Sequence, residues 1–322
     1  MERWNILWAA DTMNRINQGL YTAVDLFLLL LGRFPLGMRN FCAATLGKLG
    51  FKLAKRHRRI AIDNLTTAFG KEKSEDEIRI LAQEAFVSMV RMIFEIGWSL
   101  RLPESQYPRH FTYSGLDNYH RAEAGGRGVL LLGAHFGNWE LYPLVAHMAG
   151  VPIKIVYRPL DAQFMDLYIK DLRTRFGAGT ISTRGGAMAQ IYKSLRRGDA
   201  VGLLMDQGAD FDNGVFVDFF NRRAATNVGM AILALKSGAP VVPLFLARTG
   251  NDRFHAEFGP ALPLIKTGDR TKDIEANTQQ YNVTIEAYAR RYPDQWFWVH
   301  NRWKNLPFCP WPRTNPKVSN RY

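Results

Sequence analysis

A histidine and a glutamate stand five residues apart directly behind an apolar run. Residues 129–140 read VLLLGAHFGNWE, so His135 and Glu140 follow a run typical of a buried strand and a glycine-containing turn. A histidine there can take a proton from a hydroxyl group, and a carboxylate on one ring nitrogen would leave the other free for it. If a helix begins near residue 138, Glu140 is expected to reach His135. A lone histidine is more often structural, so the pair alone leaves both interpretations open.

Other chemistries receive little support from the sequence. His135, Glu140 and His147 lack the H-E-x-x-H spacing of a zinc site, and no cysteine stands near them. There is no G-x-S-x-G elbow, P-loop or G-x-G-x-x-G, which argues against a serine hydrolase, a nucleotide phosphotransferase and a dinucleotide enzyme. Cys42 and Cys309 form no motif and fit a reducing compartment. We expect neither a metal nor a cofactor.

The elements that must position His135 alternate between strand and helix. Apolar runs bounded by turn residues predict strands, and longer stretches between them predict helices. The expected strands are 129–132, 153–157, 201–204 and 241–246, and the expected helices lie near 138–149, 161–176, 186–197, 225–237 and 272–291. This alternation predicts an α/β fold with a mostly parallel central sheet flanked by helices. Ligands of such sheets bind at the carboxyl ends of strands, where His135 stands.

The N-terminal segment is apolar and then basic. Residues 20–34 read LYTAVDLFLLLLGRF, and the uninterrupted apolar part is shorter than the roughly 20 residues of a membrane-spanning helix. A marginal span, an interfacial helix and a buried core helix all remain open. The basic residues that follow, with no acidic residue among them, are Lys48, Lys52, Lys55, Arg56, Arg58 and Arg59. Such a cluster suits an anionic cytoplasmic leaflet, although a charge run alone is usually a solvated face. We predict a membrane-anchoring helical segment at 1–50 and one α/β catalytic domain at 51–322.

The charge balance favours an acidic partner. The chain carries 42 Lys and Arg against 29 Asp and Glu, a net charge of +13, and its 47% of hydrophobic residues is typical of a globular protein. The excess fits nucleic acid, an anionic membrane or an acidic protein. The charge is spread along the chain and no nucleic-acid-binding signature occurs, so we do not expect nucleic acid as a partner. A non-catalytic lipid-binding protein is an alternative, but it would need neither His135 nor Glu140.

Several segments resemble, in order, those of the late acyltransferases of lipid A (lipopolysaccharide) biosynthesis, the lauroyl- and myristoyltransferases of Gram-negative bacteria. These belong to the glycerolipid-type acyltransferases with an H-x4-D/E motif, which HFGNWE resembles. The other matching segments are RRIAIDNLTTAF at 58–69, Arg184-Gly185, Asp206-Gln207, GVFVDFF at 214–220 followed by Ala224-Ala225-Thr226, and PDQWFWVHNRWK at 293–304. The resemblance covers about residue 16 to about residue 306 and ends in its most specific segment.

The resemblance implies an acyltransferase at the cytoplasmic face of the inner membrane. It would move a fatty acyl chain from an acyl thioester, expected to be acyl-acyl carrier protein or else acyl-coenzyme A, to a hydroxyl of a lipid A precursor or related glycolipid. His135 would be the general base and Glu140 would orient it, with direct attack and no acyl-enzyme. Another membrane phospholipid or glycolipid as acceptor stays open, because Asn221 and Asn301 depart from the family pattern.

The resemblance also suggests substrate-binding residues. Arg158, Arg184 and Arg302 are candidates for binding phosphate, which the planar guanidinium matches well. Gly185 belongs to the Arg184 segment. Asp206 and Gln207 are expected to position the acceptor or the arginines. Phe216, Phe219 and Phe220 would line an acyl groove or pack in the core.

Overall fold

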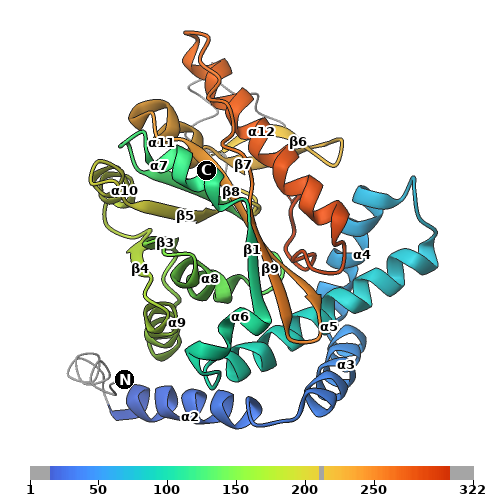
Figure 1. The fold of residues 1–322 in the computed structure, drawn as a ribbon. Helices are drawn as coiled ribbons and strands as arrows, with labels where there is room; N and C mark the ends of the chain where they lie inside the picture. Colours follow the sequence, from blue (N-terminus) through green and yellow to red (C-terminus); the bar gives the residue numbers. More distant parts are fainter. Residues whose placement is uncertain (1–14, 210–213, 305–322) are drawn as a thin grey trace.

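The computed structural model describes residues 15–209 and 214–304. Within them, a seven-stranded sheet has the strand order β1-β9-β8-β2-β5-β3-β4 (Figure 1). The strands are β1 (Phe111–Ser114), β2 (Val129–Gly133), β3 (Ile153–Tyr157), β4 (Gly179–Ser182), β5 (Ala200–Leu204), β8 (Val241–Gly250) and β9 (Arg253–Phe258). Neighbouring strands pair in parallel except β8 and β9. The predicted α/β fold with a mostly parallel sheet is confirmed.

Two helical layers cover the sheet, and the side chains of β2 alternate between them. Leu131 packs in the cluster that holds α7 (Leu116–Glu123), α8 (Tyr142–Met148) and α9 (Gln163–Arg175). Leu130 and Leu132 pack in the cluster on the other side, where the helices are α10 (Ala187–Leu195), α11 (Gly229–Ser237) and α12 (Arg270–Arg291). Burial on both faces explains why β2 reads as an uninterrupted apolar run.

A separate hairpin departs from the sequence prediction. The helix expected from residue 225 begins at Gly229 instead, because Ala224–Thr226 lie in β7 (Arg222–Asn227), which pairs antiparallel with β6 (Gly214–Phe219). Phe220 and Asn221 form the turn with φ of 50° and 56°. Left-handed conformations at both central residues match the twist of a tight hairpin, so the pairing overrides the helical propensity of the alanines.

The N-terminal third of the described chain is helical and packs on one long helix. The helices are α2 (Arg15–Leu31), α3 (Leu36–Leu53), α4 (Lys55–Phe69) and α5 (Glu75–Ser99), followed by η2 (Glu104–Gln106) and α6 (Tyr107–His110). α5 begins with the capping box of Ser74 and Glu77, and α2, α3 and α4 all contact it. Of the helices described, none alone is long and apolar enough to cross a membrane; α2 and α3 together are, but they are bent by 118°.

α5 lies against the carboxyl end of the sheet. Glu95 of α5 forms a buried, two-pronged ion pair with Arg248 near the end of β8. Arg39 of α3 pairs in the same way with Asp252, in the turn after β8. Because β2 runs parallel to β8, the loop after β2 faces the same helices.

Candidate active site

The loop that carries His135 is held on both sides by backbone contacts. The N–H of Gly137 donates to the carbonyl of Gln295 at 2.9 Å, and the carbonyl of His135 accepts from the N–H of Phe297 at 3.0 Å. Gly137 has φ +58°, and a Cβ there would lie 2.2 Å from the carbonyl oxygen of Leu246. Only glycine fits this turn, so the loop is fixed by close backbone packing.

Asp206 fixes the imidazole of His135. One carboxylate oxygen, Oδ1, lies 2.9 Å from Nδ1 of His135 and accepts from its backbone N–H at 3.0 Å. The other oxygen accepts from Nε1 of Trp296 at 2.9 Å. Burial opposes the charge on Asp206, but the charge and hydrogen bonds of His135 outweigh it, so the pKa of Asp206 lies below its ordinary value. A proton held on Nδ1 leaves the lone pair on Nε2.

The predicted contact between Glu140 and His135 is not formed. The turn of η3 (Trp139–Leu141) directs Glu140 to α9, where its two oxygens accept from Nε and Nη2 of Arg173 at 2.9 and 2.8 Å. Asp206 takes the place expected for Glu140, because β5 is the parallel neighbour of β2 and its end lies beside His135. Glu140 therefore makes its hydrogen bonds to Arg173 and not to the imidazole.

Polar and aromatic side chains surround the remaining face of the imidazole. Nε2 of Gln207 lies 3.4 Å from Nε2 of His135. The rings of Trp139 and Phe297 lie 5.1 and 6.0 Å from the imidazole, centre to centre. The His135 side chain keeps 21% of its surface exposed, whereas Asp206 keeps 1%. The imidazole is therefore accessible from outside, while the carboxylate beside it is buried.

Two of the predicted arginines share the edge of the sheet with His135. Arg158 directly follows β3 and Arg184 closely follows β4, and both are exposed. Nη2 of Arg184 lies 3.2 Å from Asp161, an exposed pair of low energetic value. Gly185 has φ +77°, which lets the chain turn into α10. Since β2, β5, β3 and β4 are consecutive and parallel, their ends form one row of loops.

Arg302 differs from the expected phosphate contact. It is 1% exposed, and its guanidinium donates to the carbonyl of Ala225 and the hydroxyl of Thr226, both at 2.6 Å. Burial lowers its pKa to about 10, against the opposing charge of Asp206. Arg302 thus fastens the closing segment to β7, because the hairpin presents acceptors to it from inside the molecule.

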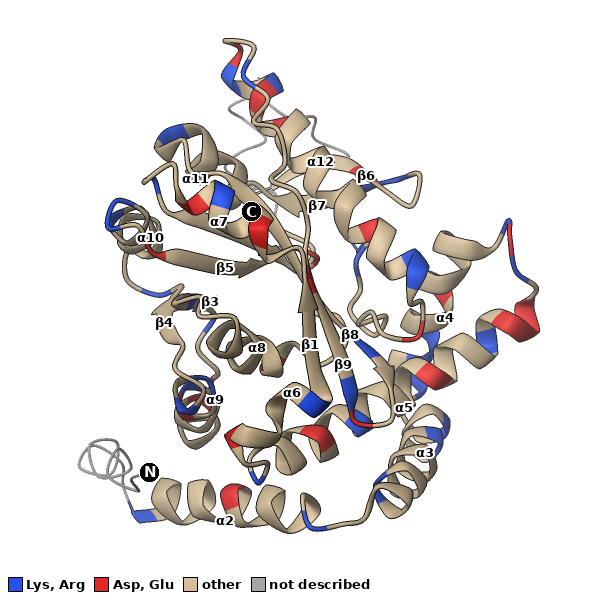
Figure 2. Cartoon of the chain, viewed as in Figure 1, with Lys and Arg blue, Asp and Glu red and all other residues tan. Residues whose placement is uncertain are grey.

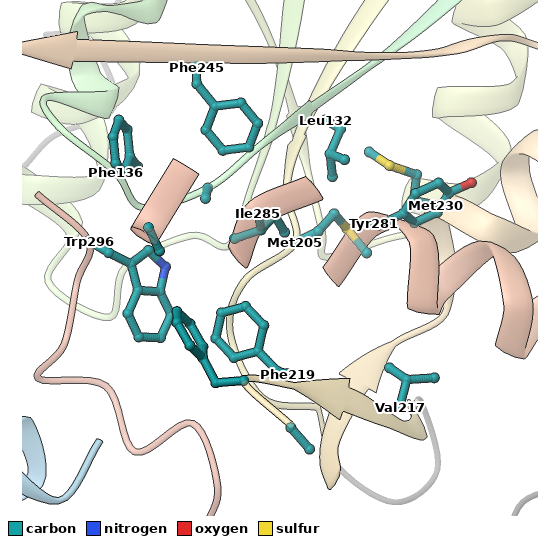
Figure 3. Packing of buried hydrophobic residues seen from close by; sticks show 14 of the residues in the cluster. Leu132, Phe136, Met205, Val217, Phe219, Met230, Phe245, Tyr281, Ile285 and Trp296 are labelled. Carbon is teal, nitrogen blue, oxygen red and sulfur yellow. The ribbon is translucent and has the colours of Figure 1, made fainter. Parts of the chain in front are cut away.

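The phenylalanines expected at an acyl groove lie in the core. Phe216, Phe219 and Phe220 are 6%, 1% and 3% exposed. Phe219 packs against the indole of Trp296 at 5.4 Å between ring centres, and Figure 3 shows the two rings side by side. Of the two readings left open, core packing is the one observed. This aromatic block supports Trp296, and through it Asp206, from behind.

A narrow apolar cavity of about 30 Å³ adjoins the site instead. It lies between the sheet and the layer of α8 and α9. Its lining includes Leu131, Gly133, Trp139, Ile153, Ile155, Arg173 and Leu204. Trp139 therefore contacts both the imidazole and the cavity.

Sequence reasoning missed three residues around the site. Arg173 and Trp296 had no signal beyond a place in a helix and in the closing segment. His300, four residues after Trp296, was quoted only as part of its motif. Burial lowers the pKa of His300 to about 4, Asp206 opposing and Arg302 adding to the effect. Within the described ranges, no group of three or more His, Cys, Asp or Glu is arranged to hold a metal.

The chain belongs to the bacterial lipid A biosynthesis acyltransferases, because the model of that family matches residues 13–305. It is therefore an enzyme of lipid A biosynthesis that transfers acyl chains.

The individual relatives span the same length. The chain is similar to the lipid A biosynthesis lauroyltransferase of Escherichia coli, with 29% identity over 88% of this chain and 90% of the relative. The palmitoleoyltransferase of the same organism is 28% identical over 85% and 88%. Its myristoyltransferase is 26% identical over 82% and 80%. The names of these relatives differ in the acyl group transferred.

Proposed function

We propose that this enzyme acylates a hydroxyl of a lipid A precursor by direct attack on an acyl thioester, with His135 as general base and Asp206 as the residue that orients it. The observation that carries the proposal is that Asp206 contacts two nitrogens of His135, the ring Nδ1 and the backbone nitrogen. It sets the tautomer and the ring orientation together. Glu140 acts at a distance, by holding Arg173 beside the cavity.

The steps balance without a protein nucleophile. Nε2 of His135 takes the acceptor hydroxyl proton as the oxygen bonds to the thioester carbonyl carbon. Asp206 stabilises the imidazolium that results. The tetrahedral intermediate then expels the thiolate, which takes the proton back from Nε2. An ester and a thiol leave, and His135 returns to its starting state.

The row of strand ends supplies the cations for phosphate groups. Arg158 and Arg184 lie on this row, and we assign them to phosphates of the acceptor or of the donor's pantetheine arm. The donor we propose is acyl-acyl carrier protein, a small acidic protein that a net charge of +13 would attract. The reaction would take place at the cytoplasmic face of the inner membrane, where such a carrier is available.

The acyl chain of the donor would enter the cavity beside Trp139. The cavity is mostly apolar, and Trp139, which contacts the imidazole, forms part of its lining. At about 30 Å³ it is too narrow for a whole chain, so we expect Trp139 and neighbouring side chains to part on binding. The buried Phe216–Phe220 block offers no such space in this structure.

The test compares two histidines in purified enzyme. His135→Ala should lower the rate of acyl transfer about a hundred- to ten-thousand-fold with an unchanged melting curve. The matched control is His147→Ala on α8. The side chain of His147 is 47% exposed, and its removal should leave the rate unchanged. Mass spectrometry of the lipid product provides the readout. Transfer by His135→Ala at the wild-type rate would exclude the general-base assignment.

A second measurement addresses direct attack. Intact protein incubated with acyl-acyl carrier protein alone should show no mass gain. An acyl adduct that forms at a competent rate and disappears when acceptor is added would replace direct attack by a two-step route.

A further inference from the structure

α2 is fastened to the catalytic domain along its length. The hydroxyl of Tyr21 donates to Asp171 of α9 at 2.6 Å. One turn later, Asp25 pairs with Arg175 of α9 at 3.0 Å and accepts from the hydroxyl of Tyr168 at 3.2 Å. These contacts, made by side chains that are at most about a quarter exposed, tie the helix sideways to the domain.

The end of α2 lies directly on α5. A Cβ on Gly32 would stand 2.0 Å from the carbonyl oxygen of Gly97, and a Cβ on Gly97 would stand 2.2 Å from that of Leu28. Two glycines thus allow backbone-to-backbone packing at the crossing. α2 is thus packed on the domain both at its middle and at its C-terminal end.

The outward faces of α2 and α3 are strongly apolar. On α2 the exposed large apolar residues are Ile16, Leu20, Leu26, Phe27 and Leu30, and on α3 they are Met38, Phe41, Leu46, Leu49 and Leu53. Phe41 and Leu53 expose 70% and 68% of their surface. Between the ends of α2, Asp25 is the one charged residue, and Figure 2 shows the helix on either side of it in tan. We call these residues the apolar surface; so many exposed apolar side chains on one layer mark a binding face.

A basic groove adjoins the apolar surface. It is hollowed beside the start of α4, which follows α3 directly, and has a volume of about 590 Å³. Its lining residues are Lys55, Arg56, Arg58, Arg59, Ile62 and Arg79. None of these is acidic, so the groove attracts anions. An apolar face bordered by cations is the pattern of a helix that lies in the interface of an anionic leaflet.

We propose that the apolar surface of α2 and α3 docks on one leaflet of an anionic phospholipid membrane, both helices lying in the membrane plane and the basic groove binding phosphate headgroups. α2 is then a docking element built into the catalytic domain and not a separate membrane-spanning anchor. This inference rests on the proposed function only in taking the acceptor to be a membrane lipid.

The docking surface lies at the end of the molecule that holds the site. Figure 1 shows α2 and α3 at the opposite end from α7, α10 and α11. α5 connects this end to the site, because Asn138, three residues after His135, donates to Glu95 and to the carbonyl of Met92, both at 3.1 Å. A hydroxyl group of a membrane lipid could therefore reach His135 while the lipid stays close to the membrane.

Flotation with vesicles tests the surface in full-length purified enzyme. Phe41→Glu with Leu53→Glu should weaken partitioning to phosphatidylcholine–phosphatidylglycerol vesicles at least tenfold, because the two apolar side chains are no longer there to be buried in the membrane. The matched control is Val283→Glu on α12, which is 57% exposed and lies outside the surface. Arg58→Gln with Arg59→Gln should cost about fivefold per charge, and only with the anionic lipid. Equal partitioning of all variants would overturn the proposal.

Depth measurements distinguish a docked helix from a spanning one. A nitroxide at Leu30→Cys or Phe41→Cys, in a Cys42→Ser and Cys309→Ser background, should lie about 5–10 Å below the phosphates at both positions. A label at the bilayer midplane, or one in water, would contradict in-plane docking.

Activity in detergent micelles separates this proposal from the proposed function. Phe41→Glu with Leu53→Glu should keep wild-type transfer there. If these variants bind vesicles normally but lose salt-sensitive activity with acyl-acyl carrier protein, the surface binds the carrier and the membrane proposal is wrong. If docking behaves as expected but His135→Ala is active, only the proposed function fails.

Discussion

Asp206 accepts two hydrogen bonds from His135, one from the ring Nδ1 at 2.9 Å and one from the backbone N–H at 3.0 Å, through a single oxygen. The second oxygen is held by Trp296, so the carboxylate cannot rotate away. This arrangement fixes where the imidazole points and which nitrogen bears the proton. The pairing joins the ends of two adjacent parallel strands.

Asp206→Asn should lower the rate of transfer about a hundred- to ten-thousand-fold while KM changes little. The amide cannot stabilise the imidazolium, and it offers one acceptor where the carboxylate offers two. The pH–rate profile should change as well, because the substitution removes the negative charge beside the reacting group. Asp218→Asn, on the exposed side of β6, is the control and should behave as wild type. An Asp206→Asn enzyme with an unchanged rate and profile would exclude the orienting role.

Glu140→Ala should reduce activity by a different route, through stability. The Glu140 and Arg173 side chains are 8% and 11% exposed, so removing one partner leaves a nearly buried charge uncompensated. Such a change costs about 3–5 kcal/mol in the free energy of unfolding. Replacing both residues, with Glu140→Leu and Arg173→Met, should recover most of that loss in urea unfolding measured in detergent. If the double variant is as unstable as the sum of the single ones, the pair does not act as a unit.

Ile155→Phe should shift the preferred acyl donor to a shorter chain. Ile155 of β3 lines the cavity beside Trp139, and a larger side chain leaves less room for the methyl end. The neighbouring Val156 packs on the opposite face of the sheet, which makes Val156→Phe a control of equal bulk. Competition between acyl-acyl carrier protein donors of different length, read by mass spectrometry, gives the preference. The same shift in both variants would place the acyl chain elsewhere.

We predict that the protein loses stability in mild acid because of His300. Its pKa is about 4 in the folded protein against an ordinary value of 6.5, so between these values the unfolded chain binds a proton that the folded one does not. The free energy of unfolding should therefore fall as the pH drops through this window, by about 1 kcal/mol per pH unit at most, because His300 is only partly buried. His300→Gln should flatten that slope in urea unfolding between pH 7 and pH 5, whereas His147→Gln should leave it as in wild type.

Much of the fold could be predicted because the sheet is locally encoded. The apolar runs at 129–132, 153–157 and 241–246 became β2, β3 and part of β8. The strands β1 and β9 have no comparable apolar run. The start of α11 was missed because Ala224 and Ala225 are good helix formers, and only their pairing with β6 makes them a strand.

The sequence pointed to two residues of the candidate site, but it did not predict the contact between them. His135 and Asp206 were both identified, but the partner of His135 was expected at Glu140, five residues away, rather than seventy-one. Sequence spacing reveals local proximity and says nothing of which strands become neighbours. The burial of Arg302 could not be foreseen for the same reason, since its acceptors Ala225 and Thr226 lie in a distant hairpin.

The contact between the His135 loop and residues 295–297 also determines when, during synthesis on the ribosome, the candidate active site can form. The backbone partners of His135 and Gly137 are made some 160 positions later in the chain. At about 5–20 residues per second, His135 waits roughly 10–30 s for them. During that time β2 can form with its early neighbours, but the loop lacks the segment that closes it. A nascent chain arrested before residue 295 would therefore fold much of its sheet and remain without activity, so that catalysis begins only after residues 295–297 have been made.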